Sequence, residues 1–138
     1  LYKKEIDPLS PYKINGRICY AMAAQEAKEK KWNDALVLNS HGNIIESSIS
    51  NIFWVKNKEI FTPPVSEGCI AGIMRAHWIA VLKEKGIPVI EMPLIKELLL
   101  QADEGFLTNS IRKIRWVYAI ENKQYKNEFI LKNLLHCI

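Results

Sequence analysis

Glycine is scarce in this sequence, and the motifs that depend on it are missing. The chain has 138 residues and only six glycines, and no Gly-x-Gly-x-x-Gly follows an apolar run, so a dinucleotide-binding turn is not predicted. The P-loop, the Gly-x-Ser-x-Gly nucleophile elbow and the His-Glu-x-x-His metalloprotease motif are also missing. These absences remove the motif-defined hydrolases and nucleotide-binding folds from consideration.

Cysteine and histidine are equally sparse. The cysteines are Cys19, Cys69 and Cys137, and the histidines are His41, His77 and His136. An odd number of widely spaced cysteines without a Cys-x-x-Cys pair predicts neither a disulfide framework nor a structural zinc site. Free thiols indicate a reducing compartment, so we expect a cytoplasmic protein. The isolated histidines are expected in turns, on a helix surface or near the end of the chain rather than as ligands.

Long apolar runs and a concentrated charge are missing too. No run approaches the roughly 20 apolar residues that span a bilayer, so no membrane partner is expected. The 19 basic and 15 acidic residues leave a net charge of only +4, and the basic residues are spread along the chain, so no nucleic-acid surface is expected. With 49% hydrophobic and 25% charged residues, the composition predicts one globular domain with a real core.

The first half of the chain predicts a helix followed by a meander. Residues 1–12 contain Pro8 and Pro11 and are expected to form an extended lead-in. Alanine, glutamate and lysine dominate residues 17–31 and predict a helix. Short apolar runs separated by turn residues over 34–62 predict an antiparallel meander, which the prolines after Thr62 end.

The second half alternates helices and short strands. Expected elements are a helix at 72–85 stopped by Gly86, an edge strand at 87–90, a helix at 95–101, strands at 105–108 and 116–120, and a helix at 127–135 with Asn127 as its N-cap. The mixture predicts an α+β or mixed α/β fold class.

Four local features carry the candidate chemistry. They are Lys13 before the first helix, Glu46 in an apolar, hydroxyl-rich strand, the small-residue segment 68–75 that opens a helix, and the strand end at 108–110. Each has an ordinary alternative, in order a surface lysine, an outward-facing strand residue, a plain loop-to-helix junction and a turn. Together they supply what pyridoxal 5'-phosphate requires: an amine, an acid for the ring nitrogen, and amide and hydroxyl donors for a phosphate.

The sequence resembles the class IV aminotransferase family of fold-type IV pyridoxal-phosphate enzymes. This family includes branched-chain and D-amino-acid aminotransferases and 4-amino-4-deoxychorismate lyase. The matching residues are Lys13, Asn15, Arg17, Ala24-Gln25-Glu26-Ala27, Asp34-Ala35-Leu36-Val37-Leu38, Gly42, Glu46, Asn51-Ile52-Phe53, Thr62-Pro63-Pro64, Gly72-Ile73-Met74-Arg75, Ala102-Asp103-Glu104 and Thr108-Asn109-Ser110. Glu46 follows Lys13 by 33 positions, which is similar to the family's spacing of lysine and acid.

The resemblance implies a fold and a set of roles. The fold is the large C-terminal domain of the D-amino-acid-aminotransferase-like enzymes, an antiparallel-rich sheet or pseudo-barrel with flanking helices, here over residues 13–138 and without the family's small N-terminal domain. The implied roles are Lys13 as Schiff-base lysine and proton shuttle, Glu46 as partner of the pyridinium nitrogen, Ile70 packed on the ring, the amides of Ile73 and Met74 with the Ser110 hydroxyl on the phosphate, and Asn109 beside the phosphate or substrate.

The same resemblance implies a small-molecule substrate and a homodimer. Branched-chain enzymes place a tyrosine five positions after the lysine, and this sequence has Ile18 there. The local sequences Lys13-Ile14-Asn15-Gly16-Arg17 and Gly72-Ile73-Met74-Arg75 favour the lyase or D-amino-acid branch. The leading hypothesis is therefore an aminodeoxychorismate lyase that forms 4-aminobenzoate for folate biosynthesis. The alternatives are a branched-chain or D-amino-acid aminotransferase, or an inactive domain that binds no cofactor.

Overall fold

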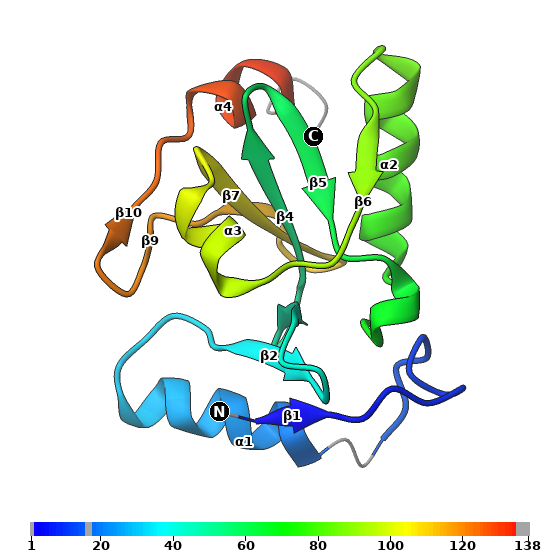
Figure 1. Cartoon of the computed structure of the whole chain (residues 1–138), viewed down its shortest axis with the longest axis vertical. Helices are drawn as coiled ribbons and strands as arrows, with labels where there is room; N and C mark the ends of the chain where they lie inside the picture. The colour runs from blue at the N-terminus through cyan, green and yellow to red at the C-terminus, as the bar shows by residue number, and fades with distance from the viewer. Residues whose placement is uncertain (1, 16–17, 135–138) are drawn as a thin grey trace.

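Four α-helices form where alanine-rich or amphipathic stretches predict them. The computed structural model describes residues 2–15 and 18–134 of the chain (Figure 1). The helices are α1 (Ile18–Glu29), α2 (Ile73–Glu84), α3 (Lys96–Gln101) and α4 (Glu128–Leu134), with a 3₁₀ turn η1 at Val65–Glu67. Ala23 and Ala27 are the buried residues of α1, four apart on one face. The chain turns after α2 at Gly86, whose φ of +73° is left-handed, as expected of a glycine that stops a helix.

The strands build one large sheet and a separate two-stranded ribbon. The strands are β1 (Lys3–Lys4), β2 (Leu36–Asn39), β3 (Ile44–Ser47), β4 (Asn51–Lys56), β5 (Glu59–Thr62), β6 (Val89–Glu91), β7 (Glu104–Asn109), β8 (Lys113–Trp116), β9 (Ala119–Ile120) and β10 (Lys123–Gln124). β2 to β5 pair in sequence and antiparallel, which confirms the meander. The last two strands pair only with each other.

β4 is the central strand. Along one edge it pairs with β7 in a continuous register from Asn51↔Thr108 to Val55↔Glu104. The opposite edge of β4 is shared by β3 and β5. β3 pairs with the start of β4 at Asn51, and β5 pairs with the end of β4 from Trp54 to Lys56. The beginning of β4 is therefore surrounded by β3 and β7.

Two short strands extend the sheet in parallel. β6 pairs with β5 through Ile60↔Val89, and its end position agrees with the edge strand expected from Pro88. β1 pairs with β2 through Lys3↔Leu38 and Lys4↔Asn39. The lead-in at residues 1–12 thus contributes a strand to the sheet, and the side chain of Lys4 is buried.

The prediction of one strand at 116–120 is wrong. β8 ends at Trp116, and β9 begins at Ala119. A tight turn joins β7 to β8, and Lys113 at the start of β8 has a φ of +59°. After this turn β8 pairs antiparallel with β7 as far as Trp116, which lies opposite Phe106. After the Val117 amide donates to the Gly105 carbonyl at 2.7 Å, the chain leaves the sheet. The apolar run alone could not reveal where pairing with β7 ends.

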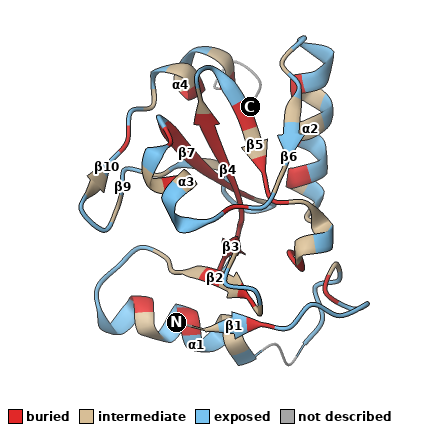
Figure 2. Cartoon of the chain, in the orientation of Figure 1, coloured by how far each residue is buried: buried red, intermediate tan, exposed pale blue. Residues whose placement is uncertain are grey.

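The core lies on both faces of β4, because alternate side chains of a strand point to opposite faces. Ile52 and Trp54 pack with Leu94 and Leu99 on one face. Phe53 and Val55 pack on the other with Trp78 and Leu82 of α2 and with Ile130 and Leu134 of α4. Figure 2 shows β4, which is buried from Asn51 to Val55, with α1 below it beside β1 and β2. This architecture confirms the mixed α/β prediction.

Candidate functional site

Glu46 is the buried acid at the centre of the candidate site. It lies in β3, where every residue is buried, and its own side chain is 3% exposed. Tyr20, from α1, donates its hydroxyl proton to Glu46 Oε1. The Ile70 amide donates to the same oxygen at 3.1 Å, and the Lys4 ammonium lies 3.8 Å away. A buried carboxylate with donors and a cation around it is compensated for its loss of hydration.

Asn51 joins Glu46 to the loop after η1. Its Nδ2 donates to the Ile70 carbonyl at 2.8 Å and approaches Glu46 Oε2 at 3.3 Å. Its Oδ1 lies against Gly72, so close that a Cβ built on Gly72 would sit 2.1 Å from it. One amide side chain at the start of β4 thereby positions the acid, the loop and the beginning of α2 together.

The segment that carries Lys13 is anchored to the same loop. The Ala71 amide donates to the Pro11 carbonyl at 2.9 Å. Lys13 itself is exposed, and its ammonium makes no hydrogen bond or ion pair within residues 2–15 and 18–134. The structure therefore anchors the backbone close to this loop, while the Lys13 side chain is available to a ligand. Arg17, which belongs to the same matched motif, lies outside the described residues.

The start of α2 has backbone amides available for an anion. The first hydrogen bond of this helix runs from the Ala76 amide to the Gly72 carbonyl, so the amides of Ile73, Met74 and Arg75 have no partner within the helix. Gly72, at the N-cap, has no side chain to cap them. Ile73 is 79% exposed, so the first residue of this helix lies at the surface.

The end of β7 adjoins the site through Asn109. Its Nδ2 donates to Ser50 Oγ at 2.9 Å, and its Oδ1 accepts the Ile111 and Arg112 amides. These bonds fix the β7–β8 turn beside the residue that precedes Asn51. Ser110 follows with an exposed side chain. Asn109 thus acts as a turn residue that fixes the loop on which the Ser110 hydroxyl is presented.

The residues present fit pyridoxal phosphate. Glu46 is a buried acid that would suit a ring nitrogen, the first α2 amides and the Ser110 hydroxyl would suit a phosphate, and Lys13 is an amine without a described partner. The absent Cβ of Gly72 leaves the space in which Asn51 reaches the α2 start. The structure thus joins Glu46 to Ile70 directly and, through Asn51, to Gly72 at the start of α2. It also anchors the Lys13 and Asn109 segments next to them.

Cys69 lies between these elements and is chemically quiet. Burial raises the pKa of its thiol to about 12, and the charge of Glu46 contributes in the same direction. Its sulfur faces the carbonyls of Pro63 and Pro64 at 3.9 and 3.7 Å. The thiol is therefore protonated at neutral pH and serves as a packing group.

Lys4, Tyr20 and Asn51 take part in the site although sequence reasoning gave them no role. Lys4 was one of many lysines expected on the surface, and β1 is too short to show a pattern. Tyr20 lies two positions after Ile18, and the resemblance places the family's tyrosine at position 18, so Tyr20 was given no role. Asn51 was among the matching residues, and a polar residue at the start of the apolar β4 was the one available signal.

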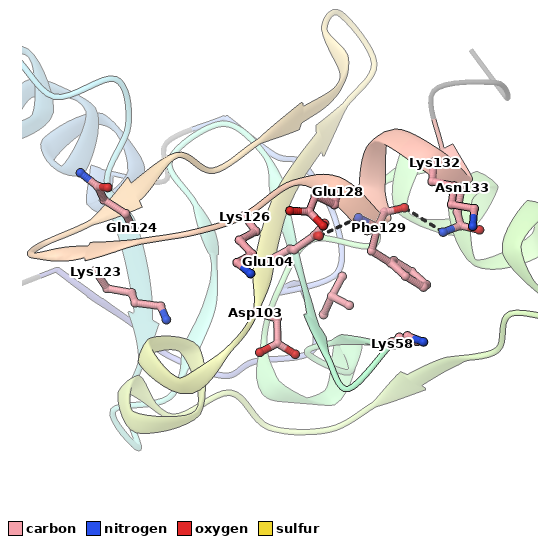
Figure 3. Close-up of a pocket in the computed structure, with 11 residues that line it drawn as sticks. Lys58, Asp103, Glu104, Lys123, Gln124, Lys126, Glu128, Phe129, Lys132 and Asn133 are labelled. Atoms are coloured by element: carbon pink, nitrogen blue, oxygen red, sulfur yellow. Dashed lines mark hydrogen bonds between the residues drawn. The ribbon is translucent and has the colours of Figure 1, made fainter.

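The cleft drawn in Figure 3 lies elsewhere. It has a volume of about 670 Å³ and is formed by β7, β10, α4 and the β4–β5 turn. Its lining includes Lys58, Asp103, Lys126 and Lys132 but none of the predicted site residues. Within the described part of the chain, no group of three or more His, Cys, Asp or Glu side chains could hold a metal ion, and no helix there has the length and apolarity to cross a membrane.

Comparisons with known proteins show the family of this chain. The family model described as amino-transferase class IV matches residues 3–120. The aminodeoxychorismate lyase of Vibrio harveyi is 32% identical over 126 residues, 91% of this chain and 46% of that protein. A Synechocystis protein named probable branched-chain-amino-acid aminotransferase is 36% identical over 105 residues, 76% of this chain and 34% of that protein. The chain therefore spans less than half the length of these relatives.

Solved structures of a lyase and an aminotransferase share the fold of this chain. The 4-amino-4-deoxychorismate lyase of Pseudomonas aeruginosa superposes with a TM-score of 0.88 and 25% identity, covering 96% of this chain and 50% of that one. An aminotransferase from Brucella abortus, solved with the cofactor PLP, gives a TM-score of 0.77 and 32% identity, covering 83% of this chain and 41% of that one.

Proposed function

Because this chain belongs to the amino-transferase class IV family, we propose that it is the cofactor-binding part of a pyridoxal-phosphate-dependent 4-amino-4-deoxychorismate lyase. The observation that carries this proposal is the presence, in one connected site, of a buried and hydrogen-bonded acid, Glu46, and of the first amides of α2, which have no partner within the helix. An acid for a ring nitrogen and a donor set for a phosphate are the two fixed contacts that such a cofactor needs.

In this proposal each site residue has a distinct task. Pyridoxal phosphate, when bound, supplies an electron sink for the reacting substrate. Glu46 faces the ring nitrogen and Ile70 packs on the ring. The amides of Ile73 and Met74, with the Ser110 hydroxyl, bind the phosphate, and Asn109 fixes the turn that presents Ser110.

Lys13 has the chemical role. Its Nζ would hold the cofactor, and as a free amine it would take a proton from the substrate and return one, as general base and acid. In the lyase reaction the products are pyruvate and 4-aminobenzoate. Its exposure is suited to this exchange, because the amine must reach both cofactor and substrate.

The lyase is favoured over the aminotransferase by the residue at position 18. Ile18 stands where branched-chain enzymes place a tyrosine, and an isoleucine side chain has no polar atom with which to make the contact of a phenol. A branched-chain aminotransferase is the second candidate, because the Synechocystis relative is 36% identical and the same lysine and acid would serve both reactions.

The cofactor assignment is tested by chemical trapping. The full-length protein is incubated with pyridoxal phosphate, reduced with borohydride, digested and mapped by mass spectrometry. We expect visible absorbance before reduction and a pyridoxyl label on Lys13. Lys28, an exposed lysine of α1, is the control position. A label elsewhere, or no visible band, would contradict the assignment and favour an inactive domain.

The reaction is tested by two parallel assays on that protein. Aminodeoxychorismate is supplied in one, and the formation of 4-aminobenzoate is followed. Branched-chain 2-oxo acids and glutamate are supplied in the other, and 2-oxoglutarate is followed. Product in the first assay alone supports the lyase, whereas product in the second alone replaces it with the aminotransferase.

We further infer a homodimeric, cytoplasmic protein. The support is the family membership and the free thiols of Cys19 and Cys69. Light scattering of the full-length protein measures the assembly state, and a monomeric mass would contradict the dimer.

A further inference from the structure

Lys4 is a buried lysine whose ammonium is held firmly among the residues around Glu46. It is 4% exposed. Its Nζ donates to the Gly68 carbonyl at 2.5 Å, to the Ser10 carbonyl at 3.1 Å and to the Tyr20 hydroxyl oxygen at 2.9 Å. Three donors on three acceptors satisfy an ammonium group, and a buried charge of this kind also needs an anion nearby. Glu46 Oε1, at 3.8 Å, is that anion.

The Tyr20 hydroxyl lies between the Lys4 ammonium and the Glu46 carboxylate and hydrogen-bonds to both. Its oxygen accepts a hydrogen bond from Lys4, and its proton goes to Glu46 Oε1. A phenol can donate only one proton, so the ammonium at its oxygen helps to keep that proton aimed at the carboxylate. The order is therefore ammonium, phenol, carboxylate, and it joins β1, α1 and β3.

We propose that Lys4 is a positioning residue that, through Tyr20 and its own charge, keeps the Glu46 carboxylate ionised and oriented towards the cofactor's ring nitrogen. Lys4 does not touch the reacting atoms. It favours the state in which the negative charge stays on Glu46, because a cation stabilises a nearby anion most when both are withdrawn from water. The cofactor part of this inference rests on the proposed function, whereas the coupling of Lys4 to Glu46 does not.

Two other titratable groups close to Lys4 and Glu46 in the described part of the chain are neutral or have partners of their own. Cys69 follows Gly68 in the loop, and its thiol stays neutral at working pH. Arg75 of α2 directs its guanidinium to the Pro63 carbonyl at 2.9 Å and to Glu91 at 2.8 Å. Asn51 is neutral. Lys4 is a described cation within ion-pair distance of Glu46, at 3.8 Å.

The coupling is tested first without cofactor. Unfolding midpoints are measured for K4M, E46Q and the double variant. Each single change leaves a buried partner uncompensated, so we expect each to lower the melting temperature by roughly 10 °C. The double variant should fall by clearly less than the sum. Lys3→Met, the exposed neighbour in the same strand, should leave the midpoint within about 2 °C of the parent. Additive losses would overturn the proposal.

The cofactor part is tested by visible spectroscopy of the full-length protein. K4M loaded with pyridoxal phosphate should differ from the parent in the relative intensities of its visible absorbance bands. The pH at which these bands interconvert should also differ from that of the parent. K4R should restore both, because it keeps the charge, and K3M should match the parent. A K4M spectrum and pH profile identical to those of K3M would overturn the cofactor role.

The two arms separate this inference from the proposed function. If the parent protein shows no cofactor band at all, the proposed function fails and with it the cofactor role of Lys4. A non-additive double variant would then still establish the Lys4–Glu46 coupling. A band in the parent with additive unfolding data would support the function and refute the coupling.

Discussion

Gly72 begins α2 at the point where Asn51 comes closest to it. Its φ of −67° and ψ of 139° are open to any residue, so an alanine there is limited by space alone. The added Cβ would lie 2.1 Å from Asn51 Oδ1. We expect Gly72→Ala to lower the free energy of unfolding by about 1–3 kcal/mol through overpacking and to weaken cofactor binding further. Denaturant unfolding and cofactor titration measure both.

Two further variants separate the contact from a general effect of alanine. In Gly105→Ala the new Cβ would meet Val117 at 3.5 Å, an ordinary contact, so a smaller loss is expected. Combining Asn51→Ala with Gly72→Ala removes the clash, and the combined loss should be less than the sum. Equal losses in Gly72→Ala and Gly105→Ala would contradict the predicted clash.

Cys69 is expected to resist alkylation in the folded protein. Its pKa of about 12 leaves only about one thiolate in ten thousand at pH 8, and the sulfur is buried. Iodoacetamide at pH 8 should modify the half-buried Cys19 first. Peptide mapping measures the order, and denaturant should make both thiols reactive. Rapid labelling of Cys69 without denaturant would contradict the burial that encloses Glu46.

At the scale of an element, α4 depends on a carboxylate from another strand. Glu104, at the start of β7, accepts the amides of Phe129 and Ile130 at 2.7 and 2.9 Å. Asn127 precedes the helix as predicted, and its carbonyl accepts the Leu131 amide, but the acceptor for the first-turn amides is Glu104. The start of α4 is thus stabilised through tertiary structure.

Glu104→Ala should therefore destabilise α4 selectively. Loss of a helix cap costs about 0.5–2 kcal/mol, and the two buried amides would lose their acceptor. We expect faster hydrogen exchange of the α4 amides and a lower unfolding midpoint. Glu97→Ala, an exposed first-turn residue of α3, should change neither. Unchanged exchange in α4 would show that packing alone maintains the helix.

At the scale of the whole molecule, alkaline pH should reduce stability. Burial raises the pKa of Cys69 from 9.0 to about 12, and burial with the charge of Glu121 raises that of Tyr125 from 10.0 to about 12. A group whose pKa is raised by folding gives its full stabilisation below its unfolded pKa and loses it as the pH rises towards the folded value. Stability should therefore decline from about pH 9 towards pH 12.

Urea unfolding at several pH values measures this decline. Cys69→Ala removes one of the two groups, so its stability should fall less steeply with pH, whatever its value at pH 7. Cys19→Ala should keep the slope of the parent. A stability that stays constant from pH 8 to pH 11 would contradict the burial of both groups.

Much of the architecture follows from local patterns. Alanine spacing predicts α1, apolar runs between turn residues predict β2 to β5, and glycine marks the end of α2. These features depend on side chains a few positions apart, so they can be recognised in one dimension. The break between β8 and β9 could not, because it depends on where the register with β7 ends.

The candidate chemistry divides in the same way. Lys13, Glu46 and the segment 68–75 were singled out by residue type along the chain, and the family resemblance implied their roles. What surrounds them required the tertiary structure: the Lys4 ammonium reaches Gly68, 64 positions away, and Asn51 reaches the Ile70 carbonyl 19 positions away. No local pattern records such contacts, because a buried ion pair is created only when β1, α1 and β3 close around the same volume and exclude water.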